Sequence, residues 1–63
     1  MKREDLIREI SALGGRFVRH GARHDWYEQP VTGEHQAVPR HREINERLAR
    51  AILRRLSVPT SPH

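Results

Sequence analysis

The 63-residue sequence contains no cysteine, a single lysine and no long hydrophobic run. The absence of cysteine excludes disulfide bonds and cysteine-based zinc sites. Without a long apolar run, the sequence has no membrane-spanning segment and no hydrophobic region of a signal peptide, so we expect a cytoplasmic protein. A chain this short forms at most one domain with a small core, so a partner protein would add to its stability.

Positive charge dominates the sequence, because 12 Lys and Arg residues against 8 Asp and Glu residues give a formal net charge of +4. All of the cationic residues except Lys2 are arginines. The planar guanidinium group binds phosphate oxygens in pairs, so the bias favours nucleic acid or an acidic protein as a partner. A GC-rich genome produces the same bias, so composition alone identifies no phosphate site.

Apolar periodicity and turn signals predict an α+β fold with the element order α-β-β-β-α. Apolar residues at helical spacing predict a helix over residues 3–13, which ends at Gly14-Gly15. Three runs of β-forming residues between short turns predict an antiparallel meander with both helices on one face. The predicted strands and turns are 16–20, Gly21-Ala22-Arg23, 24–29, Pro30-Val31-Thr32-Gly33 and 34–38, with Pro39 ending the last strand.

A second helix is predicted from Asn45, a favourable N-cap residue, to about Leu56. Residues 1–57 then form one domain, and the proline-containing segment 58–63 forms a frayed tail. The arginines of this helix either form a solvated face, contact a phosphate backbone or bind an acidic partner. The predicted core residues are Leu6, Ile7, Ile10, Leu13, Phe17, Val18, Leu48 and Ile52.

His24 is the main candidate for chemistry. It begins the strand 24–29 directly after the glycine-containing turn, and Arg23 places a positive charge beside it. Imidazole accepts and donates protons near neutral pH, so this histidine is suited to general acid–base catalysis. The alternative is a surface strand residue without a role. Zinc binding by His20 and His24 is not expected, because no acid or cysteine completes a ligand set.

Four stretches of the sequence, taken together, resemble the HicA family of bacterial toxins, the mRNA-cleaving half of HicA–HicB toxin–antitoxin pairs. The resemblance covers about residues 2–57. Gly21-Ala22-Arg23-His24 stands where the family has a Gly-Ser-x-His signature, so Ala22 replaces the family's usual serine and its hydroxyl group. The other three stretches are Lys2-Arg3-Glu4-Asp5-Leu6-Ile7, Ala37-Val38-Pro39-Arg40-His41 and residues 44–53.

The resemblance implies a fold like that of a double-stranded-RNA-binding domain (dsRBD). It implies an endoribonuclease (mRNA interferase) that halts translation, with His24 as its catalytic histidine. It also implies a HicB-type antitoxin as the partner that covers the active face. RNA carries its own nucleophile, the 2′-hydroxyl group, so we expect neither a metal nor a cofactor. His24 is then the general base, the general acid or both, and His20, His41 or water provides the second proton transfer.

Further residues are predicted to bind the RNA substrate. Gly21 belongs to the signature turn, Arg23 is the nearest candidate for the phosphate, and Arg40 and Arg42 are more distant candidates. Trp26 shares the His24 face of a regular strand, where it either stacks on a base or packs against the antitoxin or a helix edge; its neighbour Tyr27 then faces the core. Two rival functions stay open: a non-catalytic RNA-binding module, and a protein that binds only its antitoxin.

Overall fold

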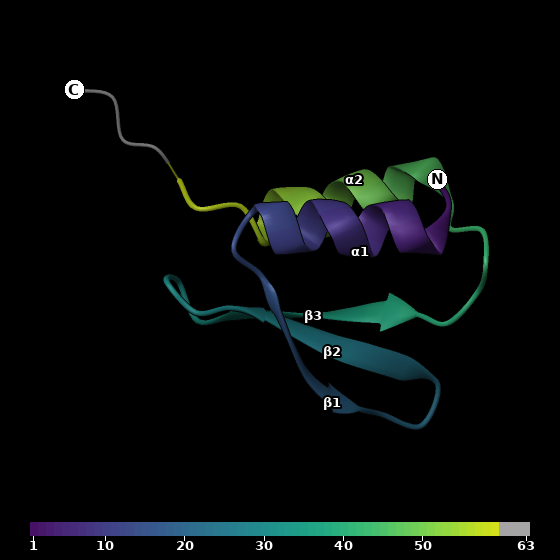
Figure 1. The fold of residues 1–63 in the computed structure, drawn as a ribbon, viewed down its shortest axis with the longest axis horizontal. Helices are drawn as coiled ribbons and strands as arrows, with labels where there is room; N and C mark the ends of the chain where they lie inside the picture. The colour runs from purple at the N-terminus through teal and green to yellow at the C-terminus, as the bar shows by residue number, and fades with distance from the viewer. Residues whose placement is uncertain (60–63) are drawn as a thin grey trace.

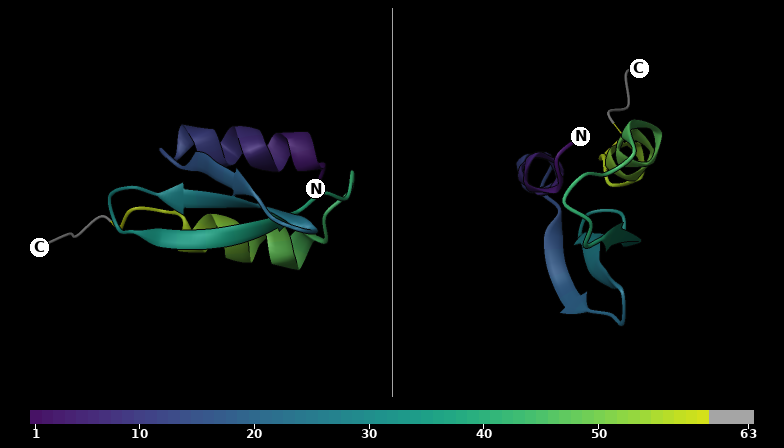
Figure 2. Two further views of the ribbon diagram at one scale, coloured as in Figure 1. Left: turned by 90° about the horizontal axis from the view of Figure 1, so that it is seen from below. Right: turned by 90° about the vertical axis from the view of Figure 1, so that its right-hand side faces the viewer.

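The computed structural model describes residues 1–59, which form two helices lying side by side over a three-stranded sheet (Figures 1 and 2). β2 lies in the centre of the sheet and pairs antiparallel with both β1 and β3. The predicted α+β fold with the dsRBD-like order α-β-β-β-α is therefore confirmed. The elements are α1 Arg3–Ala12, β1 Arg16–His20, β2 His24–Gln29, β3 Glu34–Pro39 and α2 Glu46–Arg55.

Glycine ends α1, as the sequence predicts. The N–H groups of Gly14 and Gly15 donate to the carbonyl oxygens of Ser11 (3.0 Å) and Ile10 (2.9 Å). Gly14 has a φ of 90°, a conformation that glycine adopts without steric cost. A Cβ atom at Gly15 would lie 2.6 Å from Cγ2 of Ile10, so close contact with the helix also requires glycine there.

The start of α2 agrees with the prediction from the sequence, whereas the end of β3 differs from it by one residue. The Asn45 side chain caps α2 by accepting hydrogen bonds from the N–H groups of Arg47 (2.9 Å) and Leu48 (3.2 Å). The sequence predicts that β3 ends before Pro39. In the structure Pro39 is instead the last residue of β3 and pairs with His24. Proline is tolerated there because β3 is an edge strand, where one side of the ladder needs no N–H donor.

The core lies between the two helices and the sheet. Leu6, Ile10 and Ile52 are buried, as predicted, and Ile7 packs against them while partly exposed. The buried apolar residues that the sequence pattern did not assign to the core are Val38, Ile44, Ala49 and Leu56. The prediction was wrong for Leu13, Phe17, Val18 and Leu48, which are 37–45% exposed.

Two physical reasons explain the errors in the predicted core. All five residues of β1 are exposed, because this edge strand runs away from the two helices and leaves Phe17 and Val18 unprotected (Figure 1). In α2 the stripe that faces inward contains Ala49 and Ile52. Leu48 lies one residue earlier, about 100° around the helix axis, and therefore falls at the margin of the buried face.

β2 separates its side chains cleanly between two faces. Asp25 and Gln29 are buried, and Tyr27, on the same face, packs against the core, as predicted for this tyrosine. His24 and Trp26 alternate with them and so lie on the other face. The pairing with β1 contains an irregularity at Val18, but this extra residue is in β1 and leaves the alternation of β2 intact.

Two sequence predictions concern a membrane-spanning segment and the C-terminal tail. Among residues 1–59, no helix has the length and apolar character needed to cross a membrane. The predicted tail, residues 58–63, falls largely on residues 60–63, which lie outside the described residues. The division into a domain over residues 1–57 and a tail therefore stays a prediction.

Candidate functional site

His24 lies at the tip of the β1–β2 hairpin and is exposed. Its backbone carbonyl accepts a hydrogen bond from the N–H of Gly21 (2.7 Å), which closes the turn between them. A depression of about 440 Å³ lies beside it and is lined by Arg23, His24, Pro39, Arg40 and His41. The pairing of His24 with Pro39 is what brings the two segments together. The structure therefore groups His24 with two of its predicted phosphate-binding arginines and with a second histidine.

Arg23 and Arg40 differ in how their guanidinium groups are used. Within residues 1–59, Arg23 forms no hydrogen bond or ion pair, so its charge is available to a ligand in the depression. Arg40 donates to the carbonyl oxygens of Gly21 (2.6 Å), Ala22 (3.3 Å) and His24 (3.3 Å). The two predicted phosphate ligands thus have different local roles: Arg23 faces the depression, and Arg40 binds the turn.

Asp25 is a buried carboxylate next to His24 that the sequence analysis did not assign to the site. Its Oδ1 accepts from Nε of Arg40 (3.0 Å) and lies 2.7 Å from Nδ1 of His20, and its Oδ2 accepts from Nη2 of Arg3 (2.6 Å). Arg3 also donates from Nε to the carbonyl of Pro39 (2.8 Å). Asp25 therefore connects α1, the hairpin and the end of β3. We call these four side chains, Arg3, His20, Asp25 and Arg40, the Asp25 cluster.

The electrostatics of the Asp25 cluster keep its carboxylate ionised. The hydrogen bond with His20 is the largest cause that lowers the pKa of Asp25 below its ordinary value of 3.8, and Arg40 lowers the pKa further through its hydrogen bond and its charge. Burial acts in the opposite direction, because desolvation disfavours the charged form. The hydrogen bonds and the Arg40 charge outweigh burial, so Asp25 is a carboxylate at neutral pH.

The lowered pKa of Asp25 predicts a loss of stability in acid. A carboxylate with a depressed folded-state pKa stabilises the fold above its ordinary pKa of 3.8, and this contribution is lost as the pH falls toward the lower folded-state value. Asp25→Asn should therefore flatten the fall in the urea unfolding midpoint below about pH 4. The control is Asp5→Asn, because the Asp5 carboxylate is in an exposed ion pair with Arg8. If the unfolding midpoints of Asp25→Asn and the wild type fell equally in acid, the lowered pKa of Asp25 would be contradicted.

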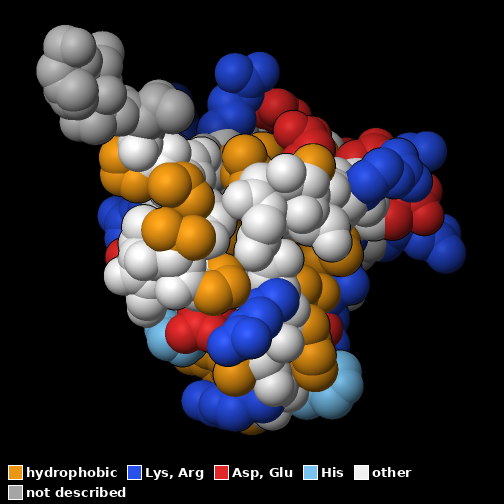
Figure 3. All heavy atoms as spheres, turned by 60° about the vertical axis from the view of Figure 1, so that its left-hand side comes forward, with side chains coloured by type: hydrophobic (Ala, Val, Ile, Leu, Met, Phe, Trp, Pro, Cys, Tyr) orange, Lys and Arg blue, Asp and Glu red, His pale blue; other side chains and the backbone are white. Residues whose placement is uncertain are grey.

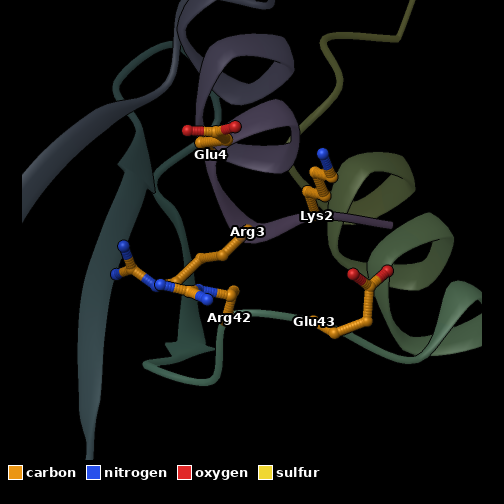
Figure 4. A pocket seen from close by; sticks show the side chains of 5 residues that line it. All are labelled: Lys2, Arg3, Glu4, Arg42 and Glu43. Carbon is orange, nitrogen blue, oxygen red and sulfur yellow. The ribbon is translucent and has the colours of Figure 1, made fainter.

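Arg42 lies in a different depression from His24. This second depression, of about 530 Å³, is lined by Lys2, Arg3, Glu4, Arg42 and Glu43 at the start of α1. Figure 4 shows the Arg3 and Arg42 side chains extending toward the strands, while Lys2 and Glu43 lie on the α2 side. The structure therefore does not group Arg42 with the residues around His24, and only Arg3 belongs to both this depression and the Asp25 cluster.

Trp26 has a cationic neighbour that the sequence analysis missed. The guanidinium carbon of Arg19 lies 5.5 Å from the centroid of the Trp26 ring, within the range of a cation–π contact. A Cβ atom at Gly21 would lie 3.0 Å from both Nε1 of Trp26 and the carbonyl oxygen of His24. Glycine at this position therefore lets the indole ring lie directly against the turn that carries His24.

Part of the remaining positive charge is neutralised locally. Arg8, Arg16 and Arg50 form ion pairs with acidic neighbours on the surface. On the face seen in Figure 3, Lys and Arg side chains lie at several separate places, with acidic groups beside several of them and hydrophobic side chains between. Among residues 1–59, no three His, Cys, Asp or Glu side chains are grouped so that they could hold a metal ion.

Comparison with known proteins identifies the family. A sequence model of the HicA toxins of bacterial toxin–antitoxin systems matches residues 3–58. No curated protein and no solved structure matches the chain. The matched segment runs from the first residue of α1 past the end of α2 and contains the turn, His24 and both segments of the depression. Because the match covers most of the 63 residues, the chain belongs to the HicA toxin family.

Proposed function

We propose that this chain is the toxin of a type II toxin–antitoxin system and acts as an endoribonuclease on mRNA, thereby inhibiting translation. The observation that carries the proposal is the depression that combines His24, Arg23 and His41. Within residues 1–59, the ring nitrogens of His24 and His41 form no hydrogen bonds, so both rings are available to a ligand. A proton-transfer group beside free positive charge is what RNA cleavage through the 2′-hydroxyl requires.

In the proposed reaction His24 acts as the general base. It takes the proton of the 2′-hydroxyl, whose oxygen then forms a bond with phosphorus. The bond between phosphorus and the 5′-oxygen breaks, and that oxygen receives a proton from the general acid. The products are a 2′,3′-cyclic phosphate and a 5′-hydroxyl group, and no other reactant is consumed. Arg23 stabilises the additional negative charge on the phosphate oxygens.

His41 is the better of the two histidines for the second proton transfer. It lines the same depression as His24, two residues beyond the strand partner of His24. His20, by contrast, does not line the depression, and its Nδ1 is engaged by Asp25. The β2 alternation also places Asp25, and with it the paired residue His20, on the face opposite His24. We therefore assign the general acid to His41.

The remaining parts of the proposal concern partners and location. Membership in the HicA family implies an antitoxin partner and an RNA target; we propose that the antitoxin is of the HicB type, that the RNA is mRNA and that the protein acts in the cytoplasm. Trp26 and Arg19 lie on the His24 face of the sheet, where a base can stack on the indole ring or on the guanidinium plane.

The proposal is tested with purified protein and an end-labelled single-stranded RNA in the presence of EDTA. We expect cleavage with 2′,3′-cyclic phosphate ends, because the scheme uses protein side chains and the RNA hydroxyl group alone. RNA binding without cleavage would instead favour the non-catalytic RNA-binding module. A tight complex with an antitoxin and no affinity for RNA would leave only the antitoxin-binding function.

A further inference from the structure

We propose that Arg40 and Asp25 are positioning residues that hold the turn before His24, and that Arg40 is not a phosphate ligand. This inference rests on the proposed ribonuclease function, and it replaces the phosphate contact that the sequence suggests for Arg40. The turn has three residues, Gly21-Ala22-Arg23, and one of them is glycine. A glycine has more backbone freedom in the unfolded chain than any other residue, so a fixed turn here needs additional contacts.

Arg40 supplies contacts to both sides of the turn. Its guanidinium donates to the carbonyl oxygens of Gly21 and Ala22 before His24, and to that of His24 itself. The turn is also closed by a backbone hydrogen bond from the Gly21 N–H to the carbonyl oxygen of His24 (2.7 Å). Because three carbonyl groups meet at one planar cation, rotation of the turn or of the His24 backbone requires breaking charge-assisted hydrogen bonds.

Asp25 fixes the direction of the Arg40 side chain. Its Oδ1 accepts from Nε of Arg40, and the carboxylate itself is held by Arg3 from α1 and by His20 from β1. Arg3 also binds the carbonyl of Pro39, the residue that precedes Arg40. The Arg40 side chain is therefore held at both ends, at its backbone through the Pro39 carbonyl and at its guanidinium group through Asp25. The Asp25 cluster thereby connects the turn with α1 and β3.

The donor count separates Arg40 from Arg23. A guanidinium group has about five N–H donors. The Arg40 group forms hydrogen bonds through Nε, Nη1 and twice through Nη2, so little capacity is left for two phosphate oxygens. Among residues 1–59, Arg23 makes no such bond and lines the same depression. The structure thus assigns the phosphate contact to Arg23 and the positioning role to Arg40.

The two roles predict opposite kinetic effects. A displaced His24 loses alignment with the 2′-hydroxyl while the RNA still binds, so kcat falls and KM changes little. A lost phosphate contact weakens RNA binding, so KM rises and the dependence of affinity on salt concentration becomes less steep. The substitution that separates the two is Arg40→Lys, which keeps the positive charge but cannot hold several carbonyl groups in a planar fork.

We expect Arg40→Lys to lower kcat by about 10- to 100-fold and to leave KM within about twofold, because a small misplacement of a catalytic group costs up to two orders of magnitude in rate. Binding of a non-cleavable 2′-O-methyl RNA should keep the affinity and salt dependence of the wild type. Arg23→Ala should instead weaken that binding. Arg8→Lys is the matched control, because Arg8 is an exposed arginine on α1 that pairs with Asp5.

Backbone NMR separates failure of this inference from failure of the ribonuclease function. If Arg40 holds the turn, Arg40→Lys shifts the amide resonances of Gly21 and Ala22 whether or not the protein cleaves RNA. Unshifted turn resonances, or weaker RNA binding at unchanged kcat, would overturn the positioning role. Absence of cleavage by the wild type would instead overturn the ribonuclease function. If Arg40→Lys unfolds, Asp25→Asn serves as the second variant. It is expected to lower kcat and to shift the amide resonances of the turn, as Arg40→Lys would.

Discussion

His24→Ala should reduce the rate of RNA cleavage by about 100- to 10 000-fold, the usual contribution of a positioned general acid–base group. The methyl group of alanine cannot accept the proton of the 2′-hydroxyl, so only phosphate binding by Arg23 and proton transfer by His41 remain. Single-turnover cleavage of an end-labelled RNA at saturating protein measures the loss in the chemical step separately from RNA affinity. Affinity for 2′-O-methyl RNA should change little, because imidazole contributes no phosphate-binding charge in its basic form.

The variant is expected to fold like the wild type, which makes the rate interpretable. The His24 side chain is exposed and, within residues 1–59, forms no hydrogen bond. His35→Ala is the matched control, because His35 is an exposed histidine on the neighbouring strand whose Nδ1 lies 2.8 Å from the carbonyl of Gly33. Undiminished cleavage by His24→Ala, or an equal loss in His35→Ala, would exclude His24 as the base.

The element order was predictable because its signals are local. Gly14 and Gly15 end α1 through contacts with residues of that same helix, and Asn45 caps α2 through the N–H groups of the next turn. A short turn between two β-forming runs also favours antiparallel pairing, so the meander followed from local sequence. None of these features depends on contacts between segments far apart in the chain.

The extent of the core was less predictable, because it depends on which strand each helix covers. Phe17 and Val18 have the β-forming and apolar character of core residues, but β1 runs away from the two helices and both residues are exposed. Their exposure is a matter of helix placement, to which residues 16–20 contribute no signal. Phe17 finds partial cover from aromatic neighbours instead, with its ring centroid 5.7 Å from that of Tyr27 and 4.7 Å from that of His20.

The candidate site divides in the same way. Arg23 lies near His24 because it precedes it in the chain, and this adjacency was visible in the sequence. The Asp25 cluster was not, because Arg3 joins it from α1 and Arg40 from beyond β3. One signal was present: Asp25 alternates onto the same face of the strand as Tyr27, and a carboxylate on a buried face requires cationic partners. An abundance of arginines left open which of them those partners are.

Gln29, at the opposite end of β2 from His24, carries the largest expected effect on stability. This residue is 1% exposed, and its Nε2 donates to the carbonyl oxygens of Leu13 (2.9 Å) and Leu56 (2.8 Å), the C-cap residues of α1 and α2. We expect Gln29→Leu to lower the free energy of unfolding by about 2–6 kcal/mol, because each of the two carbonyl groups left without a donor costs about 1–3 kcal/mol. Leucine is of similar size, so little packing is lost.

Urea unfolding followed by circular dichroism measures this effect, with Gln36→Leu as the control. Gln36 donates to the side chain of Glu34 (2.8 Å) and is not fully buried, so its replacement should cost less than about 1 kcal/mol. A domain of this size is stabilised by roughly 3–9 kcal/mol, so Gln29→Leu should bring the protein close to unfolding at room temperature. Equal midpoints for the two variants would mean that the apolar core alone holds the helix ends. A lower midpoint for Gln29→Leu alone would show that the ends of both helices depend on the buried Gln29 amide at this end of β2.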